Sequence, residues 1–585
     1  MKLMKQLSYI FPPKQRWQFA GLFLLQLIET CLDFLGISLI LPFVNVLVNA
    51  DTLREAGWYV MVSGLVGSAE TAPVLLFITL LMITVYIVKN AFMLFLLNLR
   101  VRFIGTNKVK MGTKMITCYM YKPYTFHLQR NTAEIIRNIN GDVGGAFNVI
   151  SNIFALISDV LIVIALVVYL LAVDFTMTIG VMLALALCSA FYFLFVRKRI
   201  RTLGRENRKV TARMYKAIQQ AMGGIKEVKI MGREKYFAEV YNEAGIESVR
   251  IGKRYAVISA IPARLIETLC MCTILGVLAI KIAGGENLTE VVPRLSAFAV
   301  AAIRLLPRAN GINACINSIT YNMPSLEALY DDLRESEREE AERLREIEQK
   351  KQQKKTVSVG QEDIFVRGVT YTYPNKNEPV LKNVDLTIAH GSSVGIVGAT
   401  GAGKTTLVDL ILGLLKPDSG TICYGTLDIH EDYAQWQKHI GYIPQTIYLV
   451  DDTIRSNVAL GIESDRVDDT TVWRALENAQ LAEFVRSLEN GLDTVIGERG
   501  VRISGGQRQR IGIARALYRD PEILFFDEAT SSLDNETEAA VMESINALGS
   551  QKTMIIVAHR LTTLRGCDKI YRVDEAEVEE TRLEL

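Results

Sequence analysis

Histidine and paired cysteine are scarce in this 585-residue sequence. It has five histidines and eight cysteines, and no two cysteines stand in a Cys-x-x-Cys pair. We therefore exclude a disulfide framework and a cysteine–histidine zinc site as organising features. Unpaired cysteines fit a reducing cytosol for the soluble part of the chain.

The sequence also lacks an excess of charge of one sign. Lysine and arginine number 65 against 63 aspartates and glutamates, for a formal net charge of +2. Even the most charged stretch, residues 331–355, balances acids against bases, so it indicates a solvated helical linker and no nucleic-acid partner. The first 19 residues have neither the continuous apolar region nor the cleavage site of a signal peptide. We expect a short amphipathic helix there, lying on the inner membrane surface.

Long apolar runs are what the sequence does have. Half of its residues are hydrophobic, and the mean hydropathy is +0.21. About 20 apolar residues cross a bilayer as a helix, and six windows reach that length. The predicted transmembrane helices cover residues 18–47, 73–97, 145–172, 175–196, 256–284 and 291–319.

Basic residues in the connections predict the orientation of these helices. The connections between helices two and three and between helices four and five are rich in lysine and arginine, as in RKRIRTLGRENRK (197–209). The connections on the other side hold Arg54 as their only clear basic residue. Because cytoplasmic connections carry the excess of basic residues, we expect the N-terminus, both long connections and the C-terminal part of the chain in the cytoplasm. Each long connection is predicted to be two helical extensions joined by a short crosswise segment.

The segment SSVGIVGATGAGKTTLVDLILGLL (392–415) joins a strand-like run to a helical pattern through a glycine-rich loop. This is the context of a P-loop, whose backbone N–H groups surround phosphate oxygens. We expect Lys404 to reach the β- and γ-phosphates of a nucleotide and the Thr405 hydroxyl to bind Mg²⁺. The expected phosphate-binding residues are Gly398, Gly401, Gly403, Lys404, Thr405 and Thr406.

A second motif, EILFFDEATSSLD (522–534), ends an apolar strand in two carboxylates. In register with the P-loop, Asp527 would complete the Mg²⁺ shell and Glu528 would polarise the attacking water. Together the two motifs predict an ATP hydrolase.

Between these motifs lies RISGGQRQRIGIARALY (502–518), where two glycines precede a basic amphipathic helix. A helix N-terminus of this kind can bind phosphate, and the segment resembles the signature of ATP-binding cassette (ABC) transporters. In that family Ser504, Gly505, Gly506 and Gln507 would cap the nucleotide held by the P-loop of a second domain. The resemblance therefore implies two chains, as a homodimer, with a heterodimer left open.

Further positions are similar to residues with known roles in the ABC family. Tyr373 matches the aromatic that stacks on adenine. Gln445 matches the residue that senses the γ-phosphate and contacts the membrane domain, and it is expected at the Mg²⁺ site with Thr405 and Asp527. His559 matches the switch histidine that contacts the γ-phosphate. The segments GERG (497–500) and SSLD (531–534) resemble the exporter-specific loop and the loop that communicates across the dimer. The residues expected to act in catalysis are Glu528, His559 and Gln445.

The same resemblance implies the architecture of an ABC half-exporter. We expect an α-helical membrane domain of six helices in residues 1–330, a charged linker in 331–358, and an α/β ATP-binding domain of the P-loop type in 359–585. The implied activity is transport coupled to hydrolysis of ATP with Mg²⁺, in the cytoplasmic (inner) membrane.

Charged residues inside the predicted spans bear on the cargo. One interpretation is that they pair within the protein, as Arg264 and Glu267 can at a spacing of three. The other is that Arg304 and Arg308, on one helix face, bind an anion with several oxygens such as a pyrophosphate. The basic residues are Lys89, Arg264, Arg304 and Arg308, and the acidic ones are Glu29, Asp33, Asp159 and Glu267.

A narrower resemblance, to the PglK-type flippases of bacterial protein N-glycosylation, favours the second interpretation. These flippases move a polyprenyl-pyrophosphate-linked oligosaccharide to the outer face, and their basic cavity residues match Lys89, Arg304 and, with an offset of one residue, Arg264. Gly311 stands where the type has a further arginine. A helix expected at residues 58–65 would engage the polyprenyl tail. The similar segments are QLIETCLDFLGISLILPFV (26–44), AAIRLLPRANG (301–311) and LVDLILGLLKPDSG (407–420).

The sequence thus predicts a flippase for a lipid-linked oligosaccharide or a similar pyrophosphate lipid. Its expected substrate-binding residues are Lys89, Arg264, Arg304 and Arg308. Two other functions stay open: a multidrug or lipid exporter with a broad apolar cavity, and a peptide exporter. A peptide exporter that also trims leaders is disfavoured, because no cysteine-protease domain precedes the first span.

Overall fold

A computed structural model describes most of the chain. The described residues are 2–38, 57–67, 71–173, 175–284, 288–351, 361–497, 500–528, 538–541, 543, 552–558, 564 and 566–581. The chain divides into two compact units, one made of Met1–Lys122 with Phe126–Glu340 and the other of Ala341–Leu585 with Pro123–Thr125.

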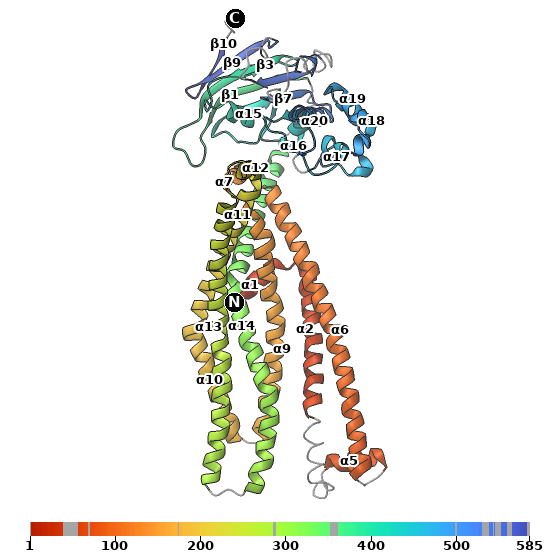
Figure 1. Cartoon of the computed structure of the whole chain (residues 1–585), viewed down its shortest axis with the longest axis vertical. Helices are drawn as coiled ribbons and strands as arrows, with labels where there is room; N and C mark the ends of the chain where they lie inside the picture. Colours follow the sequence, from red (N-terminus) through yellow and green to blue (C-terminus); the bar gives the residue numbers. More distant parts are fainter. Residues whose placement is uncertain are drawn as a thin grey trace. The chain divides into compact units, whose positions relative to one another are not determined.

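The first unit is built of helices (Figure 1). Its earlier elements are α1 (Lys2–Ile10), α2 (Pro13–Ser38), α5 (Gly57–Val66), α6 (Thr71–Met120), α7 (Tyr124–Gln129), α8 (Thr132–Arg137) and the π-helical turn η1 (Asn138–Asp142). Its later elements are α9 (Val143–Val173), α10 (Phe175–Phe191), the π-helical turn η2 (Tyr192–Val196), α11 (Arg197–Gly223), α12 (Ile225–Ile230), α13 (Glu234–Ala283) and α14 (Leu288–Lys351).

Helices occupy the described part of every predicted transmembrane window. Among the described residues, Ala72–Met120, Thr132–Val168 and Glu234–Thr273 are long and apolar enough to cross a membrane. The other three windows coincide with α2, with α10 and η2, and with α14. α14 contains Pro307 without a break and continues into the charge-rich segment as one helix.

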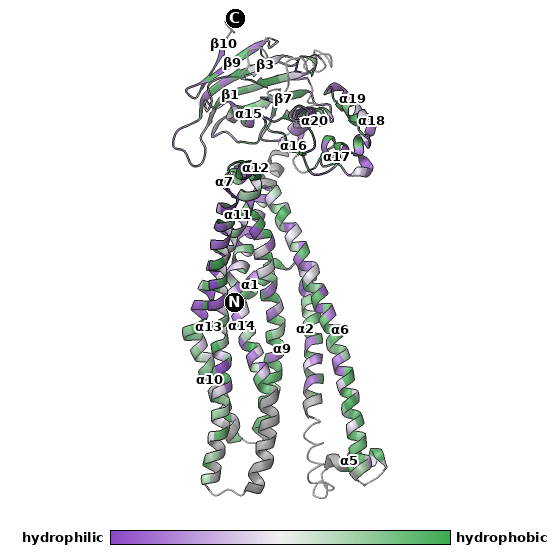
Figure 2. Cartoon of the chain, in the orientation of Figure 1, coloured by the Kyte–Doolittle hydropathy of each residue, from purple (hydrophilic) through white to green (hydrophobic). Residues whose placement is uncertain are grey.

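Several helices are far longer than a bilayer requires. α6 and α13 each contain 50 residues, roughly 75 Å at 1.5 Å per residue, against about 30 Å of hydrocarbon. The short helix α7 follows α6, and the short helix α12 lies between α11 and α13. Figure 2 shows hydrophilic residues on α11 and the adjoining part of α13, and hydrophobic residues on the part of α6 near α5. The predicted helical extensions and their short connecting segments are therefore confirmed.

The second unit is an α/β domain with two sheets. A four-stranded antiparallel sheet has the order β2-β1-β4-β5, and a six-stranded sheet has the order β10-β9-β3-β8-β7-β6. In the larger sheet the strands from β9 to β6 are parallel. The strands are β1 (Ile364–Tyr371), β2 (Leu381–Ile388), β3 (Ser393–Val397), β4 (Ser419–Tyr424), β5 (Leu427–Asp428), β6 (Ile440–Ile443), β7 (Ile523–Asp527), β8 (Thr553–Val557), β9 (Lys569–Asp574) and β10 (Glu577–Thr581).

Helices of this unit begin at residues that satisfy their first N–H groups. Asp432, Thr453, Asp468 and Ser504 each accept a hydrogen bond from a backbone N–H of the first turn, as N-caps do. The helices are α15 (Lys404–Ile411), α16 (Tyr433–His439), α17 (Ile454–Val458), α18 (Asp469–Asn478), α19 (Ala482–Ser487) and α20 (Gly505–Leu517), with single 3₁₀ turns η3 (Ser464–Arg466) and η4 (Gly491–Asp493).

The C-terminal strands form a hairpin without the glycine that such turns usually contain. β9 and β10 pair in antiparallel register from Asp574–Glu577 onward. Glu575 and Ala576 occupy the two-residue turn, both with positive φ, 43° and 68°. Positive φ at both central residues is what a tight hairpin of this length requires.

The parallel sheet brings the chemical motifs to one edge. The carboxyl ends of parallel strands meet at the same side of the sheet, where ligands of open α/β folds bind. The P-loop follows β3, Asp527 ends β7, and Gln445 follows β6. All five residues of β7 are buried, as in the centre of a parallel sheet.

Candidate functional site

The glycines of the P-loop adopt backbone conformations that side chains disfavour. Gly398, Gly401 and Gly403 have φ values of 154°, 85° and 110°. A Cβ on Gly398 would also lie 2.3 Å from the backbone oxygen of Val573 in β9. Glycine is therefore needed at position 398 both for the turn and for the packing of the loop on the sheet.

Lys404, the first residue of α15, is buried, with 7% of its surface exposed. Its Nζ donates hydrogen bonds to the carbonyl oxygens of Gly398 and Ala399, each at 2.9 Å. Carbonyl oxygens are neutral groups, so the ammonium keeps its full charge at the loop. A buried ammonium that is hydrogen-bonded to neutral oxygens and lies among glycines fits the phosphates of a nucleotide.

The two threonines after Lys404 have different surroundings. Thr405 is exposed, so it is accessible to a bound Mg²⁺. Thr406 is buried, and its hydroxyl lies 3.2 Å from that of Tyr373. Tyr373 also meets Tyr371 edge-on, with ring centroids 5.1 Å apart. The P-loop helix therefore helps to hold the predicted adenine-stacking residue, a contact that the sequence did not reveal.

The acidic residues at the end of β7 have partners from β6 and the segment after it. The Tyr442 hydroxyl donates to Oδ2 of Asp527 at 3.3 Å, and Nε2 of Gln445 donates to Oε2 of Glu528 at 2.6 Å. Burial raises the pKa of Asp527, and the negative charge of Glu528 acts in the same direction. A nearby cation would relieve this unfavourable charge, so the oxygens of Asp527 and Thr405 fit a Mg²⁺ site.

Glu528 has a left-handed backbone, with φ of 49°. This conformation costs about 1–3 kcal/mol for a residue other than glycine. The Glu528 N–H donates to the Val557 carbonyl of β8 at 3.0 Å, which holds the strained residue in place. Such strain is common at functional sites.

The signature segment forms the exposed N-terminus of α20. Ser504 accepts a hydrogen bond from the Gln507 N–H at 3.2 Å, and the Gln507 side chain accepts one from the Ser504 N–H at 2.8 Å. This capping box fixes the first turn of the helix. Ser504 and Gly505 are exposed and Gly506 is half-buried. Among the described residues, no hydrogen bond joins Ser504 or Gln507 to the P-loop of the same chain.

Other sites predicted from the sequence lie outside the described residues. They are His559, Ser531–Asp534, and Glu498 and Arg499 of the GERG segment.

Comparison with known proteins identifies the protein family of both units. Residues 381–531 match the family model of the ABC transporter, and residues 19–284 match that of the ABC transporter transmembrane region. The chain is an ABC half-transporter. As an ABC transporter, it couples ATP hydrolysis to transport.

Relatives of this half-transporter include ATP-dependent lipid A-core flippases. The flippase of Cupriavidus pinatubonensis (strain JMP 134 / LMG 1197) is 29% identical over 478 residues, which cover 81% of this chain and 78% of that protein. The flippase of Escherichia coli (strain K12) is 31% identical over 390 residues, which cover 66% and 64%. These relatives are of another type than the PglK flippases, so the narrower resemblance stays a prediction.

A solved structure has the same fold as the half-transporter. It is a bacterial Atm1-family ABC exporter with ATP bound, with a TM-score of 0.76, 22% sequence identity, and coverage of 97% of this chain and 94% of that one. The predicted fold class, a helical membrane domain joined to an α/β ATP-binding domain, is confirmed.

Lys89 and Arg308 belong to one cluster of charges that joins four helices. Asp33 of α2 pairs with Lys89 of α6 and accepts from Nη2 of Arg308 of α14 at 2.9 Å. Nη1 of Arg308 donates to Asp159 of α9 at 3.0 Å. Two cations and two carboxylates therefore balance within the helical unit.

The other two predicted cargo residues are placed differently. Arg264 is 81% exposed at its side chain and pairs with Glu267 one turn along α13, at 3.0 Å. The backbone of Arg304 lies in α14, and its side chain lies outside the described residues. Of the two interpretations of these charges, pairing within the protein is confirmed for Lys89, Arg264 and Arg308.

Gly311 allows the carboxylate of Asp159 to approach α14. A Cβ at position 311 would lie 2.3 Å from Oδ2 of Asp159, far inside van der Waals contact. The site where the PglK type has an arginine is thus filled here by an aspartate from a neighbouring helix. The sequence showed the glycine but not the carboxylate that takes its space.

Proposed function

We propose that this half-transporter works as a homodimeric, ATP-driven flippase that moves an anionic lipid from the inner to the outer face of the cytoplasmic membrane. The observation that carries the proposal is the similarity to lipid A-core flippases over 81% of the chain, which includes both units. The basic connections of the helical unit support an orientation with the ATP-binding domain in the cytoplasm.

The proposed hydrolysis follows from the contacts at the edge of the parallel sheet. Lys404 would bind the β- and γ-phosphates, and Tyr373 would stack on the adenine. Glu528, oriented by Gln445 at 2.6 Å, would polarise the attacking water. Mg²⁺ would be held by Thr405, Asp527 and Gln445 and would offset the phosphate charge.

The proposed dimer follows from the exposure of the signature. Ser504 caps its own helix and is open to solvent, so it is available to the nucleotide of a second chain. Gly505, Gly506 and Gln507 would contribute the first N–H groups of α20 to the same phosphates. His559 would complete the site on the chain that holds the P-loop.

For the cargo, we propose a polyprenyl-pyrophosphate-linked oligosaccharide or a similar pyrophosphate lipid. The described helix α5 supports this choice, because its side chains Val60, Met61 and Leu65 are mostly exposed and apolar, as contact with a lipid tail requires. Arg304 would make the first contact with the headgroup.

The other basic residues would bind the headgroup only by changing partners. Arg264 pairs with Glu267 on its own helix, so exchanging this carboxylate for a phosphate would not require another helix to move. Lys89 and Arg308 would have to exchange Asp33 and Asp159 for phosphate oxygens. Headgroup binding at these two residues would therefore rearrange α2, α6, α9 and α14 together.

Proteoliposomes test the proposal. The purified protein is given ATP and one of three cargoes: a fluorescent polyprenyl-pyrophosphate oligosaccharide, a lipid A-core lipid, or an uncharged hydrophobic drug. We expect transfer of at least one of the two lipids and none of the drug. Transfer of the drug alone would refute the flippase and leave an ATP-driven exporter.

Two variants separate the parts of the proposal. Glu528→Gln should reduce ATP hydrolysis by roughly 10²–10⁴-fold while ATP still binds. Glu522→Gln, at the other end of β7, is the control and should hydrolyse ATP normally. Arg304→Ala should lose lipid transfer and keep basal hydrolysis; normal transfer would remove Arg304 from the headgroup site.

A further inference from the structure

A polar pocket lies between five elements of the helical unit, apart from the charge cluster at Arg308. It has a volume of 230 Å³ and is bordered by the end of α8, η1, the start of α9, α11 and the part of α14 at Tyr321–Ser325. Its lining has four glycines, three asparagines, two arginines, an aspartate, two hydroxyl residues and a tyrosine, and no aliphatic side chain. Such a lining favours a strongly polar occupant.

The arginines of the pocket share one carboxylate. Nε of Arg208 donates to both carboxylate oxygens of Asp142, each at 2.9 Å, and Nη2 forms an ion pair with Oδ2 at 2.9 Å. Nε of Arg137 is 3.7 Å from the same carboxylate, too far for a hydrogen bond, and this buried atom has no hydrogen-bond partner among the described residues. Lys108 adds a third cation, because its Nζ would lie 3.8 Å from a Cβ placed on Gly144.

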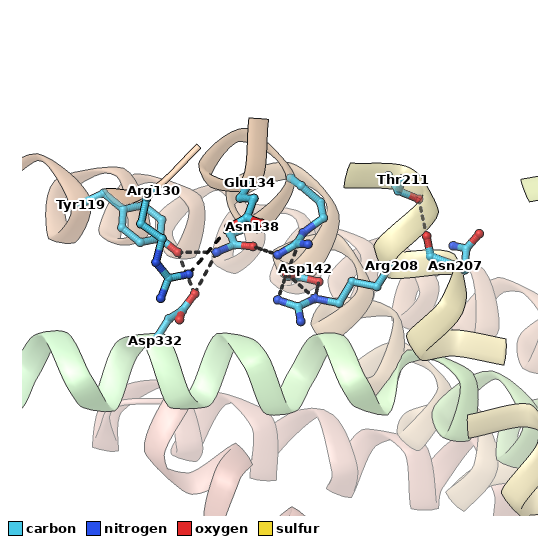
Figure 3. Close-up of polar contacts among 10 residues, drawn as sticks. Tyr119, Arg130, Glu134, Asn138, Asp142, Asn207, Arg208, Thr211 and Asp332 are labelled. Atoms are coloured by element: carbon cyan, nitrogen blue, oxygen red, sulfur yellow. Dashed lines mark hydrogen bonds and ion pairs between the residues drawn. The ribbon is translucent and has the colours of Figure 1, made fainter. Parts of the chain in front are cut away.

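Nearby acids are occupied by other groups. Figure 3 shows Asp332 beside Tyr119 and Asn138. The Tyr119 hydroxyl donates to Asp332 at 2.7 Å, and Nδ2 of Asn138 donates to it at 3.1 Å. Burial raises the pKa of Asp332. Glu134 pairs with Arg130, one turn earlier, at 3.9 Å.

Asn138 also orients Arg137 toward Asp142. Its Oδ1 accepts a hydrogen bond from Nη2 of Arg137. Its Nδ2 donates to the Tyr119 hydroxyl at 2.9 Å and to Asp332 at 3.1 Å. Arg137 is therefore anchored at one nitrogen and leaves its Nε unsatisfied. An anchored guanidinium loses little further conformational freedom when an anion binds.

The helix backbone beside the pocket contains a π-helical turn and glycines. η1 is a π-helical turn, an element often found at functional sites. A Cβ at Gly141 or Gly144 would approach only side-chain atoms, at 3.6 Å or more. These two glycines are therefore not required by packing, and their missing side chains leave the pocket open.

We propose that this pocket binds a phosphate group. Two guanidinium groups and an ammonium against one carboxylate leave a positive charge, and arginine forks match the oxygens of phosphate. The volume leaves room for a polar group attached to the phosphate. Residues 321–325 follow the apolar part of α14 on the side that leads into the ATP-binding domain, so the phosphate is one that is present on the ATP side.

The phosphate belongs either to the headgroup of a lipid in the adjacent leaflet or to a soluble compound. The proposal is independent of the cargo, because none of the pocket residues is among the predicted cargo residues.

Binding of two probes to the full chain in phosphate-free detergent micelles tests the proposal. The first probe is inorganic phosphate, followed by titration calorimetry, and the second is phosphatidic acid added to the micelles. All proteins carry Lys404→Met, so that the P-loop does not contribute. Arg137→Met should weaken binding by at least about tenfold, the effect of losing a hydrogen bond to a charged group.

Two further variants complete the design. Gly144→Leu fills the pocket from a position where a Cβ meets no atom closer than 3.8 Å, and it should weaken binding as strongly as Arg137→Met. Arg213→Met is the control, since Arg213 lies on α11 but pairs with Glu247 outside the pocket. It should change binding by less than about twofold.

The outcomes distinguish the sources of the phosphate. Binding of inorganic phosphate assigns the pocket to a soluble compound, and binding of phosphatidic acid alone assigns it to a lipid headgroup. If neither probe binds, or if Arg137→Met and Gly144→Leu bind both probes as the control does, the proposal is wrong. These measurements use no transported cargo, so they do not depend on the flippase assay.

Discussion

The two units of the half-transporter hold lysine and arginine cations with different oxygens. In the ATP-binding domain, Lys404 is bonded to two neutral carbonyl groups, so its charge remains for a ligand. In the helical unit, Lys89 and Arg308 are bonded to the carboxylates of Asp33 and Asp159, so their charges cancel. A lone charge in a membrane costs about 3 kcal/mol or more, which explains the carboxylates. Whether such a cation can bind a ligand therefore depends on its partners: neutral oxygens leave its charge available, whereas carboxylates neutralise it.

The pocket beside η1 lies between these two cases. Arg208 is fully paired with Asp142, as in the helical charge cluster, whereas Nε of Arg137 is unsatisfied. One carboxylate shared by two arginines holds them in place without cancelling their charge. Because Arg137 keeps an unsatisfied nitrogen, we propose that the pocket binds a phosphate. Arg308, in contrast, could bind an anion only after leaving its carboxylate partners.

The largest effect is expected when Lys404 and Lys89, the buried lysines of the two units, are each changed to methionine. The two variants test the comparison directly. Lys404→Met should weaken ATP binding by roughly 10–100-fold, because it removes charge-assisted hydrogen bonds, and should leave the melting temperature nearly unchanged. Lys89→Met should keep the ATP affinity and lower the melting temperature, because Asp33 loses a partner. Nucleotide titration and thermal unfolding of both variants measure this; equal ATP affinities would contradict it.

The next effect concerns the shared carboxylate of the helical cluster. Asp33→Asn leaves Lys89 and part of Arg308 unpaired and should lower the free energy of unfolding by up to about 3 kcal/mol, the low end for a broken buried pair. The reduction is limited because Arg308 keeps Asp159 and is one-third exposed. Unfolding in micelles measures the change.

A double variant and a control sharpen this prediction. Asp33→Asn with Lys89→Met should be more stable than the sum of the single changes indicates, since the second change removes an unpaired charge. Glu247→Gln breaks the exposed pair with Arg213, which lies outside the predicted spans, and should cost less than about 1 kcal/mol. Strict additivity would show that Lys89 and Asp33 do not interact.

A smaller effect tests the close approach of Asp159 to α14. Gly311→Ala places a methyl group against the carboxylate and should lower the free energy of unfolding by about 1–3 kcal/mol, the usual cost of overpacking. Gly276→Ala on α13 is the matched control, because a Cβ there meets nothing within 4 Å. It should be neutral or slightly stabilising. The same melting temperature for both variants would contradict the observed approach.

The smallest effect is a pH dependence in the ATP-binding domain. Burial, with the charge of Asp527, raises the pKa of Asp409 from 3.8 to about 6. The folded state therefore binds a proton more tightly than the unfolded state, and Asp409 lowers stability as the pH rises from about 4 to 6. Asp409→Asn should raise the melting temperature at pH 8 and have little effect near pH 4. Thermal unfolding across this range checks the sign; a larger gain at low pH would reverse it.

The sequence predicted the meeting of the ATP-binding motifs at one sheet edge better than the partners of the charges in the helical unit. The P-loop, Asp527 and Glu528 each follow a recognisable strand, and parallel strands bring such ends together. The hydrogen bond between Thr406 and Tyr373 and that between Tyr442 and Asp527 were not predicted, because each joins segments whose side-chain directions depend on packing.

Arg308 shows why the charges were harder to interpret. Its partners Asp33 and Asp159 are 275 and 149 residues away in the chain. The pair between Arg264 and Glu267, three residues apart on one helix, was predicted because helix geometry alone brings the two side chains together. The pocket beside η1 draws on three distant segments and had no local signal.

By itself the sequence determined the transmembrane windows, the ATP-binding motifs and the order of the two domains. Each of these depends on local chemistry: apolar length, glycine-rich turns, and carboxylates at strand ends. Only the tertiary structure decided which cations are neutralised and which keep a charge for a ligand. Electrostatic interaction depends on distance in space, and the packing of α2, α6, α9, α11 and α14 sets those distances.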